Sequence, residues 1–433
     1  MWFYATPNCV TRIVPGGKSQ LLEKTQDESS ARPNMSKGSV AEVFLAALRL
    51  GLTSFGGPIA HLGYFHDEYI ARRKWMDEES YADTVAFAQS IPGATSSEVG
   101  IIVGTHRAGL LGGIAAWLGF TMPSALVLIL FGYTLQFFSG NVANASWLHG
   151  LKIAAVVIVA QAVLSMGRTL APDREMASIA IASAIAAMAI EGIAIGQVVI
   201  IGVAGLVGYR FLRKTAVKLS RCSIATHIPR PVSIASLVLF FTLLGLVPVM
   251  RLLYPTNDSL AIFGGFYQAG ALVFGGGHVV LPLLNAAIVA PGWVTNSQFL
   301  AGYGMTQAMP GPLFTFSAYL GTVMNRTPSG FVGGLFALFA IFLPSFLLVY
   351  GALPFWDKLR EEESFQSALR GINAAVVGIL LAAWYDPVFT SSVVTVGDFA
   401  LTIGVGALII IWKRPPWNAV VVAAIGGILL GLL

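Results

Sequence analysis

Phe55-Gly56-Gly57-Pro58 interrupts an apolar segment that runs from about residue 41 to residue 65. Glycine tolerates unusual backbone angles, and proline lacks an N–H donor and collides with the preceding turn, so these residues break a hydrophobic helix. A similar stretch, Phe274-Gly275-Gly276-Gly277, follows 219 positions later. Interrupted backbone survives in a membrane only where protein or a water-filled cavity satisfies its polar groups. We therefore expect the broken segments, one set in each half of the chain, to meet at one central site near the middle of the membrane.

The composition is typical of a polytopic membrane protein. The 433 residues are 56% hydrophobic and 11% charged, whereas a soluble domain has about 25% charged residues. Apolar runs of about 20 residues, the length of a transmembrane helix, recur along most of the chain. The net charge of +5 lies mainly between these runs and does not indicate nucleic acid. The distant cysteines Cys9 and Cys222 form neither a metal motif nor a disulfide framework.

The polar segments define four regions. Residues 1–38 are predicted to be a disordered cytoplasmic tail, and the basic stretch 213–231 to be a cytoplasmic linker. The linker separates a first repeat, 39–212, from a second, 232–433. Thirteen apolar segments are expected, at approximately 41–65, 84–105, 110–138, 151–170, 176–190, 192–212, 232–253, 261–290, 299–323, 330–355, 371–390, 396–412 and 417–433.

The two halves share four motifs in the same order, with offsets between 217 and 221 positions. The pairs are Gly51…Phe55-Gly56-Gly57 and Gly270…Phe274-Gly275-Gly276, Gln89–Ala94 and Gln307–Pro312, Gly112-Gly113…Pro123-Ser124 and Gly333-Gly334…Pro344-Ser345, and Ala154–Val157 and Ala374–Val377. Such ordered recurrence indicates an internal repeat. An odd number of segments separates each motif from its counterpart. We therefore expect an all-α fold of two homologous repeats with inverted topology, a plan common among secondary transporters.

The basic connection 66–83 indicates how the broken segments are threaded. It contains Arg72, Arg73 and Lys74, and such residues favour the cytoplasmic side. One crossing after the tail would place them outside. Re-entrant hairpins that fold back at the breaks would return the connection to the inside and leave 291–298 outside. We favour these hairpins over broken helices that span the membrane; an amphipathic interfacial helix is the alternative for 66–83.

The helix breaks are also the candidate binding site. A helix that starts at a break presents free N–H groups and the positive end of its dipole, which together can bind an anion. The alternative is that Gly, Pro and Ser only kink the helices and allow close packing. The candidate substrate-binding residues near the breaks are Arg49, Ser54, Gly56, Gly57, His61, Gln89, Ser90, Gly93, Thr95, Ser96, Gly275, Gly276, His278, Gln307 and Gly311.

Three charged residues within apolar segments are candidates for functional roles, because burying a charge in such a segment is costly. Arg49 has a planar guanidinium that suits an oxyanion. Alternatively, it pairs with Glu42 or Glu98, or its side chain extends to the membrane surface. Glu98 and Asp386 are candidates for proton coupling, since buried carboxyl groups retain protons at higher pH than exposed ones. The alternatives are a structural pair of Glu98 with Arg49 or Arg107, and an interfacial cap for Asp386.

The motifs resemble those of the chromate transporter (CHR) family in its long, two-domain form. The resemblance covers about residues 40 to 433 and rests on Leu50-Gly51, Phe55–Pro58, Trp75–Glu79, Gln89–Gly93, Phe274–His278 and Met309–Pro312. Two positions depart from the family pattern. Ala94 and Gly277 stand where the family usually has proline, which weakens the equivalence of the two half-sites.

The resemblance implies export of chromate from the cytoplasm through the cell membrane, coupled to the proton gradient or the membrane potential, with chromate resistance as the result. Sulfate is also a tetrahedral dianion, so a sulfate or other oxyanion carrier and an anion channel are alternatives. We expect no enzymatic activity, cofactor or metal, because no catalytic or metal-binding cluster is evident. The expected partners are chromate or sulfate and the lipid bilayer, without nucleic acid; a homodimer is left open.

Overall fold

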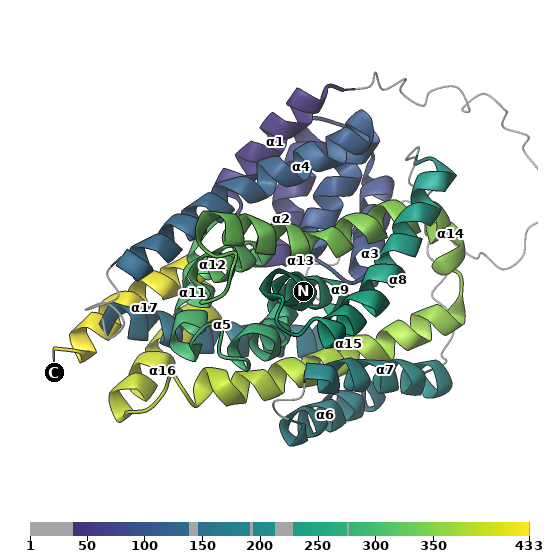
Figure 1. Cartoon of the computed structure of the whole chain (residues 1–433). Helices are drawn as coiled ribbons and strands as arrows, with labels where there is room; N and C mark the ends of the chain where they lie inside the picture. Colours follow the sequence, from purple (N-terminus) through teal and green to yellow (C-terminus); the bar gives the residue numbers. More distant parts are fainter. Residues whose placement is uncertain (1–37, 138–145, 191–193, 213–227, 275–276, 433) are drawn as a thin grey trace, which may run out of the picture. The chain divides into compact units, whose positions relative to one another are not determined.

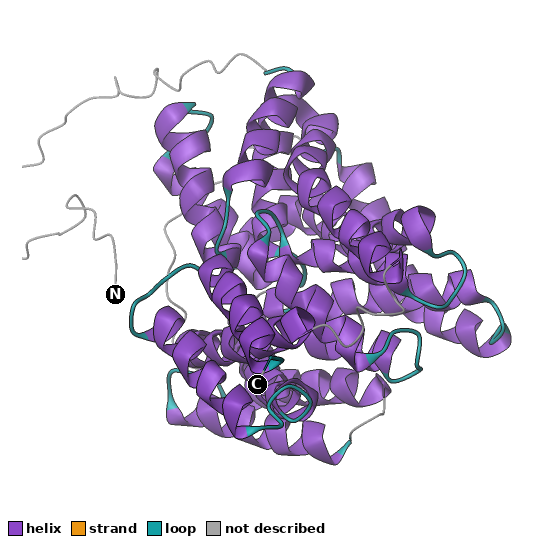
Figure 2. Ribbon diagram, turned by 90° about the vertical axis from the view of Figure 1, so that its left-hand side faces the viewer, coloured by secondary structure: helices purple, strands orange, loops and turns teal. Residues whose placement is uncertain are grey.

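The computed structural model describes residues 38–137, 146–190, 194–212, 228–274 and 277–432, and only helices and loops occur in these ranges (Figure 2). The chain divides into two units, Met1–Ser36 and Lys37–Leu433, and the description below concerns the second. Nearly all of the predicted tail and most of the predicted linker lie outside the described residues.

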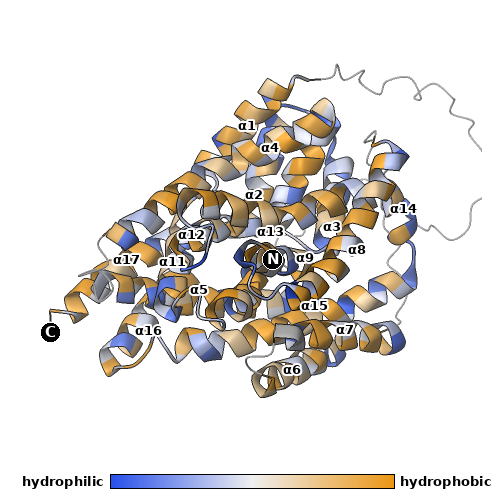
Figure 3. Cartoon of the chain, viewed as in Figure 1, coloured by the Kyte–Doolittle hydropathy of each residue, from blue (hydrophilic) through white to orange (hydrophobic). Residues whose placement is uncertain are grey.

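The described helices are strongly apolar along most of their length (Figure 3). Five of them are long and apolar enough to cross a membrane, namely Thr95–Phe137, Ser146–Leu170, Arg230–Leu253, Gly330–Leu359 and Glu363–Phe389. This confirms the predicted all-α polytopic membrane class. The other predicted crossings correspond to shorter or broken helices, which the structure arranges as follows.

The first half contains the predicted breaks. Helix α1 (Val40–Thr53) is separated from α2 (Gly57–Phe65) by residues 54–56, and α2 continues as the π-helix η1 (His66–Arg72). Gly56 and Gly57 have φ angles of 102° and 80°, which residues with a Cβ atom rarely adopt. Helix α3 (Glu78–Ser90) is separated from α4 (Thr95–Phe137) by residues 91–94, where Gly93 has a φ of 143°. A kink at Ala108 and Gly109 divides α4 again.

The second half repeats this pattern. Helix α9 (Asp258–Leu272) is followed by η2 (Gly277–Val279), α10 (Val280–Leu284) and the π-helix η3 (Asn285–Val289). Helix α11 (Asn296–Ala308) is separated by residues 309–312 from η4 (Leu313–Thr315) and α12 (Phe316–Val323). Gly311 in this gap has a φ of 101°. A π-helical segment therefore follows the first break in each half.

The broken segments of the first half fold back as hairpins. Glu42, near the start of α1, is 3.7 Å from the Arg73 guanidinium and accepts a hydrogen bond of 3.2 Å from Trp75 Nε1. Arg107, at the far end of the second broken segment, also contacts Glu42, with 3.2 Å between Nη2 and Oε2. The outer ends of both segments thus meet at Glu42, as the predicted hairpins require.

The second half shows the same fold-back at other residues. Asp258, at the start of α9, pairs with Arg326 at 3.0 Å, beyond the end of α12. The Asn325 N–H donates to the Trp293 carbonyl at 3.0 Å, which joins the end of α12 to the connection after η3. The outer ends of this pair of hairpins therefore meet around Asp258.

The remaining helices pack beside the hairpins (Figure 1). They include α5 (Ser146–Leu170), α6 (Arg174–Ala189), α7 (Ala194–Phe211), α8 (Arg230–Leu253), α13 (Gly330–Ala352), α15 (Glu363–Ala383), α16 (Val396–Ile410) and α17 (Pro416–Leu430). Three short segments complete the described chain: η5 (Leu353–Phe355), α14 (Trp356–Leu359) and the π-helix η6 (Trp384–Phe389).

The last helix pair of each half packs against the other half. Helix α15 lies against α6 and α7, and α5 lies against α16 and α17 (Figure 1). Glycine allows this proximity, because a Cβ atom on Gly371 would overlap the Ala204 carbonyl and one on Gly150 would overlap the Ala423 carbonyl. The two halves are therefore intertwined, and neither has a complete set of packing partners by itself.

Candidate functional site

Two backbone hydrogen bonds join the breaks of one half to those of the other. The Gly93 N–H donates to the Val273 carbonyl at 2.7 Å, and the Gly311 N–H donates to the Ser54 carbonyl at 3.0 Å. Gly93 and Gly311 follow the proline in the two Pro-Gly motifs, while Ser54 and Val273 precede the two Phe-Gly-Gly motifs. The bonds therefore occupy equivalent places in the internal repeat. They bring the hairpin tips of both halves together, as expected for a shared site.

A serine from a long helix packs against each tip. A Cβ atom on Gly311 would lie 2.6 Å from Ser124 Oγ, and one on Gly93 would overlap Ser345 Oγ. The Ser345 hydroxyl also accepts a hydrogen bond of 3.3 Å from the Ala94 N–H. These serines belong to the Pro-Ser motifs that indicated the repeat. The recurrence of Pro-Ser in both halves could have singled out these serines, but the sequence did not show that they lie against the tips.

His61 and Ser96 are brought together beside the first break. The two side chains are buried, with 3.3 Å between His61 Nδ1 and Ser96 Oγ. The His61 ring packs edge-on against Phe120, with 5.3 Å between ring centroids. Ser54 and Thr95, two further predicted residues, are buried too. The structure therefore gathers part of the predicted set in one place.

Glu98 is fully buried, and its carboxylate lies beside the Ser345 hydroxyl without a well-aligned hydrogen bond to a described residue. The hydroxyls of Ser54, Ser97 and Thr121 are buried without a partner among the described residues. Such groups are rare in folded proteins because their desolvation is uncompensated. Glu98 forms no ion pair with Arg49 or Arg107, so neither proposed structural pair is present. Its carboxyl group borders the Gly93 tip, where a Cβ atom would overlap it.

The second half offers different side chains at the equivalent positions. The repeat offset aligns His61, Ser96 and Glu98 with residues that cannot titrate, namely Val280, Phe314 and Phe316. His278 instead contacts Tyr303, with 2.7 Å between Nδ1 and Oη. Gln307 Nε2 has no partner among the described residues. Gly275 and Gly276, which were predicted to bind substrate, lie outside the described residues.

Three other predicted residues are either exposed or hydrogen-bonded to residues close to them in sequence. The Gln89 side chain is exposed, and the Ser90 hydroxyl donates to the Ala86 carbonyl within its own helix. Asp386 is exposed and accepts a hydrogen bond of 2.9 Å from Thr390 Oγ1, which fits the interfacial cap. Within the described ranges, none of the three contacts the polar groups at the tips.

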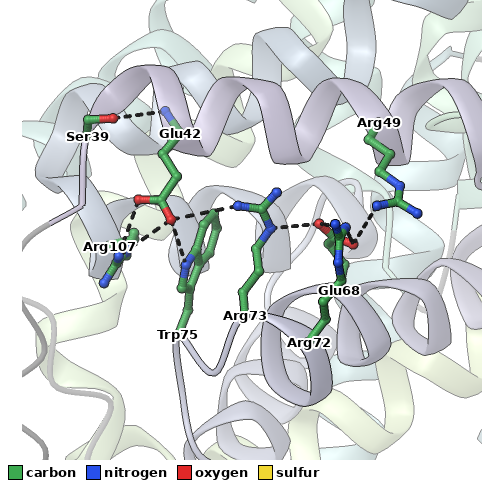
Figure 4. A network of polar contacts seen from close by, with 8 residues as sticks. All are labelled: Ser39, Glu42, Arg49, Glu68, Arg72, Arg73, Trp75 and Arg107. Carbon is green, nitrogen blue, oxygen red and sulfur yellow. Dashed lines mark hydrogen bonds and ion pairs between the residues drawn. The ribbon is translucent and has the colours of Figure 1, made fainter.

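Arg49 pairs with Glu68, rather than with Glu42 or Glu98. The distance between Arg49 Nη1 and Glu68 Oε2 is 3.8 Å, and Arg73 and Arg72 approach the same carboxylate at 2.7 and 2.8 Å (Figure 4). Burial of Glu68 favours its neutral form, but the hydrogen bonds from Arg73 and Arg72 outweigh it and hold the pKa of Glu68 below its ordinary value. Sequence reasoning overlooked Glu68, although it lies four residues before Arg72.

Comparisons with known proteins agree with these motifs. A family model described as "Chromate transporter" matches residues 41–209 and 260–431. The chain is 29% identical over 401 residues to a chromate transport protein of Pseudomonas aeruginosa, covering 90% of this chain and 91% of the relative. A probable chromate transport protein of Synechococcus elongatus is 27% identical, with 88% and 93% covered. An uncharacterized transporter of Methanocaldococcus jannaschii is 25% identical, with 84% and 88% covered. No solved structure matches the chain significantly.

Proposed function

Because this chain belongs to the chromate transporter family, we propose that it exports chromate from the cytoplasm through the cell membrane and so confers chromate resistance. The names of its relatives in Pseudomonas aeruginosa and Synechococcus elongatus support chromate as the substrate. Its apolar helices support a multi-pass location in the membrane. In this proposal the N-terminus is cytoplasmic, and the proton gradient or the membrane potential drives transport.

The meeting of the hairpin tips is the observation that best supports this function. Residues 39–212 and 232–433 act in the proposal as two inverted repeats. The ends of the first hairpins gather at Glu42 and those of the second at Asp258, while the tips are joined by the bonds at Gly93 and Gly311. Approach from opposite membrane faces explains this arrangement. A site at the tips would then open alternately to each side through small rocking motions of the two halves.

The side chains at the tips suit a weakly held oxyanion. Ser54, Ser97 and Thr121 offer buried hydroxyls without partners, and His61 and Ser96 lie beside them. Hydroxyl and amide donors bind a dianion less tightly than a cluster of guanidinium groups, because hydrogen bonds to charged donors are stronger. Such a site releases its substrate readily. Among the described residues, the predicted glycines at the tips, Gly56, Gly57 and Gly311, contribute backbone rather than side chains.

Glu98 is the proposed proton carrier. It is the fully buried carboxyl group beside the Gly93 tip, and it has no counter-ion among the described residues. A proton bound when the site faces one side and released on the other would couple the proton gradient to chromate movement. Asp386 is the weaker candidate, because it is exposed and hydrogen-bonded to Thr390.

Flux measurements in proteoliposomes test the function. We expect uptake of radiolabelled chromate to saturate with concentration and to respond to an imposed pH gradient or membrane potential. Saturable sulfate flux without chromate flux would identify sulfate, rather than chromate, as the substrate. An anion current that rises linearly with voltage and shows no saturation would identify a channel instead of a carrier.

A further inference from the structure

We propose that Arg49, Arg72 and Glu68 form a loading site that captures the oxyanion at the cytoplasmic face before it moves to the hairpin tips. This inference depends on the proposed function, and it adds a second binding position to it. The loading site lies between α1, which carries Arg49, and η1, which carries Glu68 and Arg72. It is separate from the serine, histidine and Glu98 groups at the tips.

Three guanidinium groups converge on one buried carboxylate (Figure 4). Arg73 Nε is 2.7 Å, Arg72 Nη1 2.8 Å and Arg49 Nη1 3.8 Å from the nearest Glu68 oxygen. The side chains of Arg49 and Arg72 are nonetheless 58% and 54% exposed. A guanidinium has five N–H donors, so both side chains keep donors for a ligand. Their planar groups suit the oxygen atoms of a tetrahedral anion.

The network has an excess of positive charge. Four arginines and two glutamates belong to it, and the second glutamate, Glu42, contacts Arg73 and Arg107 (Figure 4). Arg73 and Arg107 are also less exposed, at 24% and 16%, and their guanidinium groups lie over the Trp75 ring. The two excess positive charges are shared among the arginines, and Arg49 and Arg72 are the ones most exposed to an arriving anion. The excess matches the charge of one chromate or sulfate dianion.

The loading site is also close to the first break. Arg49, on α1, precedes Ser54, the residue that follows the end of α1, by five positions, which corresponds to about 7 Å along a helix. Ser54 is the residue whose carbonyl accepts the hydrogen bond from Gly311. An anion held between Arg49 and Arg72 is therefore within about two helical turns of the proposed transport site.

The other half has no equivalent charge. The repeat offset aligns Arg49, Glu68 and Arg72 with neutral residues, namely Gln268, Ala287 and Pro291. If the halves are inverted, the face opposite the loading site lacks it. Local positive potential raises the concentration of anions and their rate of association. The difference between the halves thus favours capture from the cytoplasm, which is the direction required for export.

The Glu68 carboxylate takes the place of the substrate in the empty loading site. When no anion is bound, its carboxylate holds the three guanidinium groups in place. When an oxyanion arrives, Arg49, whose contact with Glu68 is the longest of the three, exchanges the carboxylate for the ligand. Competition from Glu68 keeps capture weak enough for the anion to move onward.

The decisive experiment compares Arg72→Gln with Arg326→Gln in vesicles of defined orientation. Arg326 is a matched control, because it is also half-exposed and ion-paired, but it lies in the second half beside Asp258. For chromate offered at the cytoplasmic face, Arg72→Gln should raise KM about tenfold, the loss of one hydrogen bond to a charged group. The maximal rate, and KM at the opposite face, should stay near their normal values. Arg72→Lys should restore part of the affinity.

A second variant separates capture from structure. Glu68→Gln removes the competing carboxylate and should lower the cytoplasmic KM for chromate. An equal KM in Arg72→Gln, Arg326→Gln and the unmodified protein would overturn the loading site, as would a rise in KM at both faces. Reduced yield of Glu68→Gln with unchanged KM would count against the exchange role of Glu68. Absence of chromate flux in the unmodified protein would instead refute the proposed function.

Discussion

Individual residues show that the two halves share a backbone pattern but divide the chemistry unequally. His61, Ser96 and Glu98 lie around the first-half tips, whereas the aligned Val280 and Phe316 are apolar. An isolated buried carboxyl group is costly unless it takes up a proton or meets a ligand. One copy of such a group is enough for a single coupling step in each transport cycle. The second half then contributes the matching backbone that completes the site.

Glu98→Gln tests proton coupling. The amide has nearly the same shape as the carboxyl group but cannot exchange a proton, so the protein should reach the membrane in normal amounts. Chromate uptake by the variant in proteoliposomes should no longer respond to an imposed pH gradient. Asp386→Asn serves as the control and should keep the response. A pH-gradient response retained by Glu98→Gln and lost by Asp386→Asn would transfer the role to Asp386.

The lowered pKa of Glu68 gives a second prediction. A carboxyl group whose pKa falls on folding stabilises the folded state above its ordinary value, here 4.5, and this stabilisation disappears as the pH falls through the lower pKa of the folded state. The melting temperature of the detergent-solubilised protein should therefore drop as the pH falls below about 4.5. Glu68→Gln should be less stable at pH 7 and should lose less over this acidic range. Parallel melting curves for the two proteins would contradict the prediction.

The sequence predicted the position of Arg49 better than its partner. Burying an unpaired guanidinium in an apolar segment is costly. The sequence therefore indicates that Arg49 has a counter-ion or a polar route to water. The identity of the counter-ion depends on where the chain returns after the break. The π-helical turns of η1 bring Glu68 back alongside α1, and no spacing in the sequence specifies that return. Glu42 and Glu98 were the plausible partners by separation along the chain, and both were wrong.

At the scale of elements, the breaks were predictable because they depend on local backbone chemistry. Gly56, Gly57, Gly93 and Gly311 all adopt positive φ angles, where a side chain introduces strain. Fold-back into hairpins was also predicted, from the basic residues after the first break. The pairing of tips between the halves was only a general expectation. The particular bond from Gly93 to Val273 depends on how the hairpins dock, which local sequence does not determine.

Alanine substitutions at the tips should differ in severity. Gly93→Ala adds a Cβ atom that would overlap Glu98 and Ser345 at an already strained φ angle. We expect the free energy of unfolding to fall by about 1–3 kcal/mol and chromate transport to be lost. Gly57→Ala adds strain but meets no atom within 4 Å. It should impair transport while the protein still accumulates in the membrane. Chromate uptake and membrane yield distinguish the two effects.

Gly63→Ala is the control for these variants. Gly63 lies within α2, has an ordinary φ angle and has open space around the position of a Cβ atom. Its substitution should leave yield and uptake unchanged. Full activity in Gly57→Ala would exclude the first tip from the transport site.

Cysteine labelling tests the hairpins against the membrane. In a protein whose Cys9 and Cys222 have been replaced by serine, Lys74→Cys should react with an impermeant maleimide from the cytoplasmic side. Ser297→Cys, in the first turn of α11 just after the connection between the two hairpins of the second half, should react only from the opposite side. Both positions are exposed. Labelling of both from the same side would rule out inverted hairpins.

At the scale of the whole molecule, each half packs helices against the other half. The sequence predicted the repeats, because motifs and offsets can be read along the chain. It did not predict that α5 packs against α16 and α17 while α15 packs against α6 and α7. Helical periodicity identifies which segments are apolar but not which of several apolar surfaces they adjoin. The close approaches at Gly150 and Gly371 lie within one position of equivalence under the repeat and mark these exchanged contacts.

Splitting the chain tests this exchange. If the gene is divided within the stretch that encodes residues 213–227, each part expressed alone should be degraded, since α5 or α15 lacks its packing surface. Co-expression should restore both membrane yield and chromate uptake. Gly371→Leu should weaken the association of the fragments, whereas Gly202→Leu, where no atom lies within 4 Å of the added Cβ, should not. Stable accumulation of the first fragment alone would contradict the requirement for exchange.

The packing of α17 against α5 also has a consequence for synthesis in the cell. Helix α5 leaves the ribosome when more than half of the chain is still untranslated, yet its partner ends only at Leu430. Until then its glycine-lined surface must be shielded by lipid or by the insertion machinery. A premature stop codon that removes only α17 should therefore expose a surface in the first half, and the truncated product should be recognised by membrane proteases.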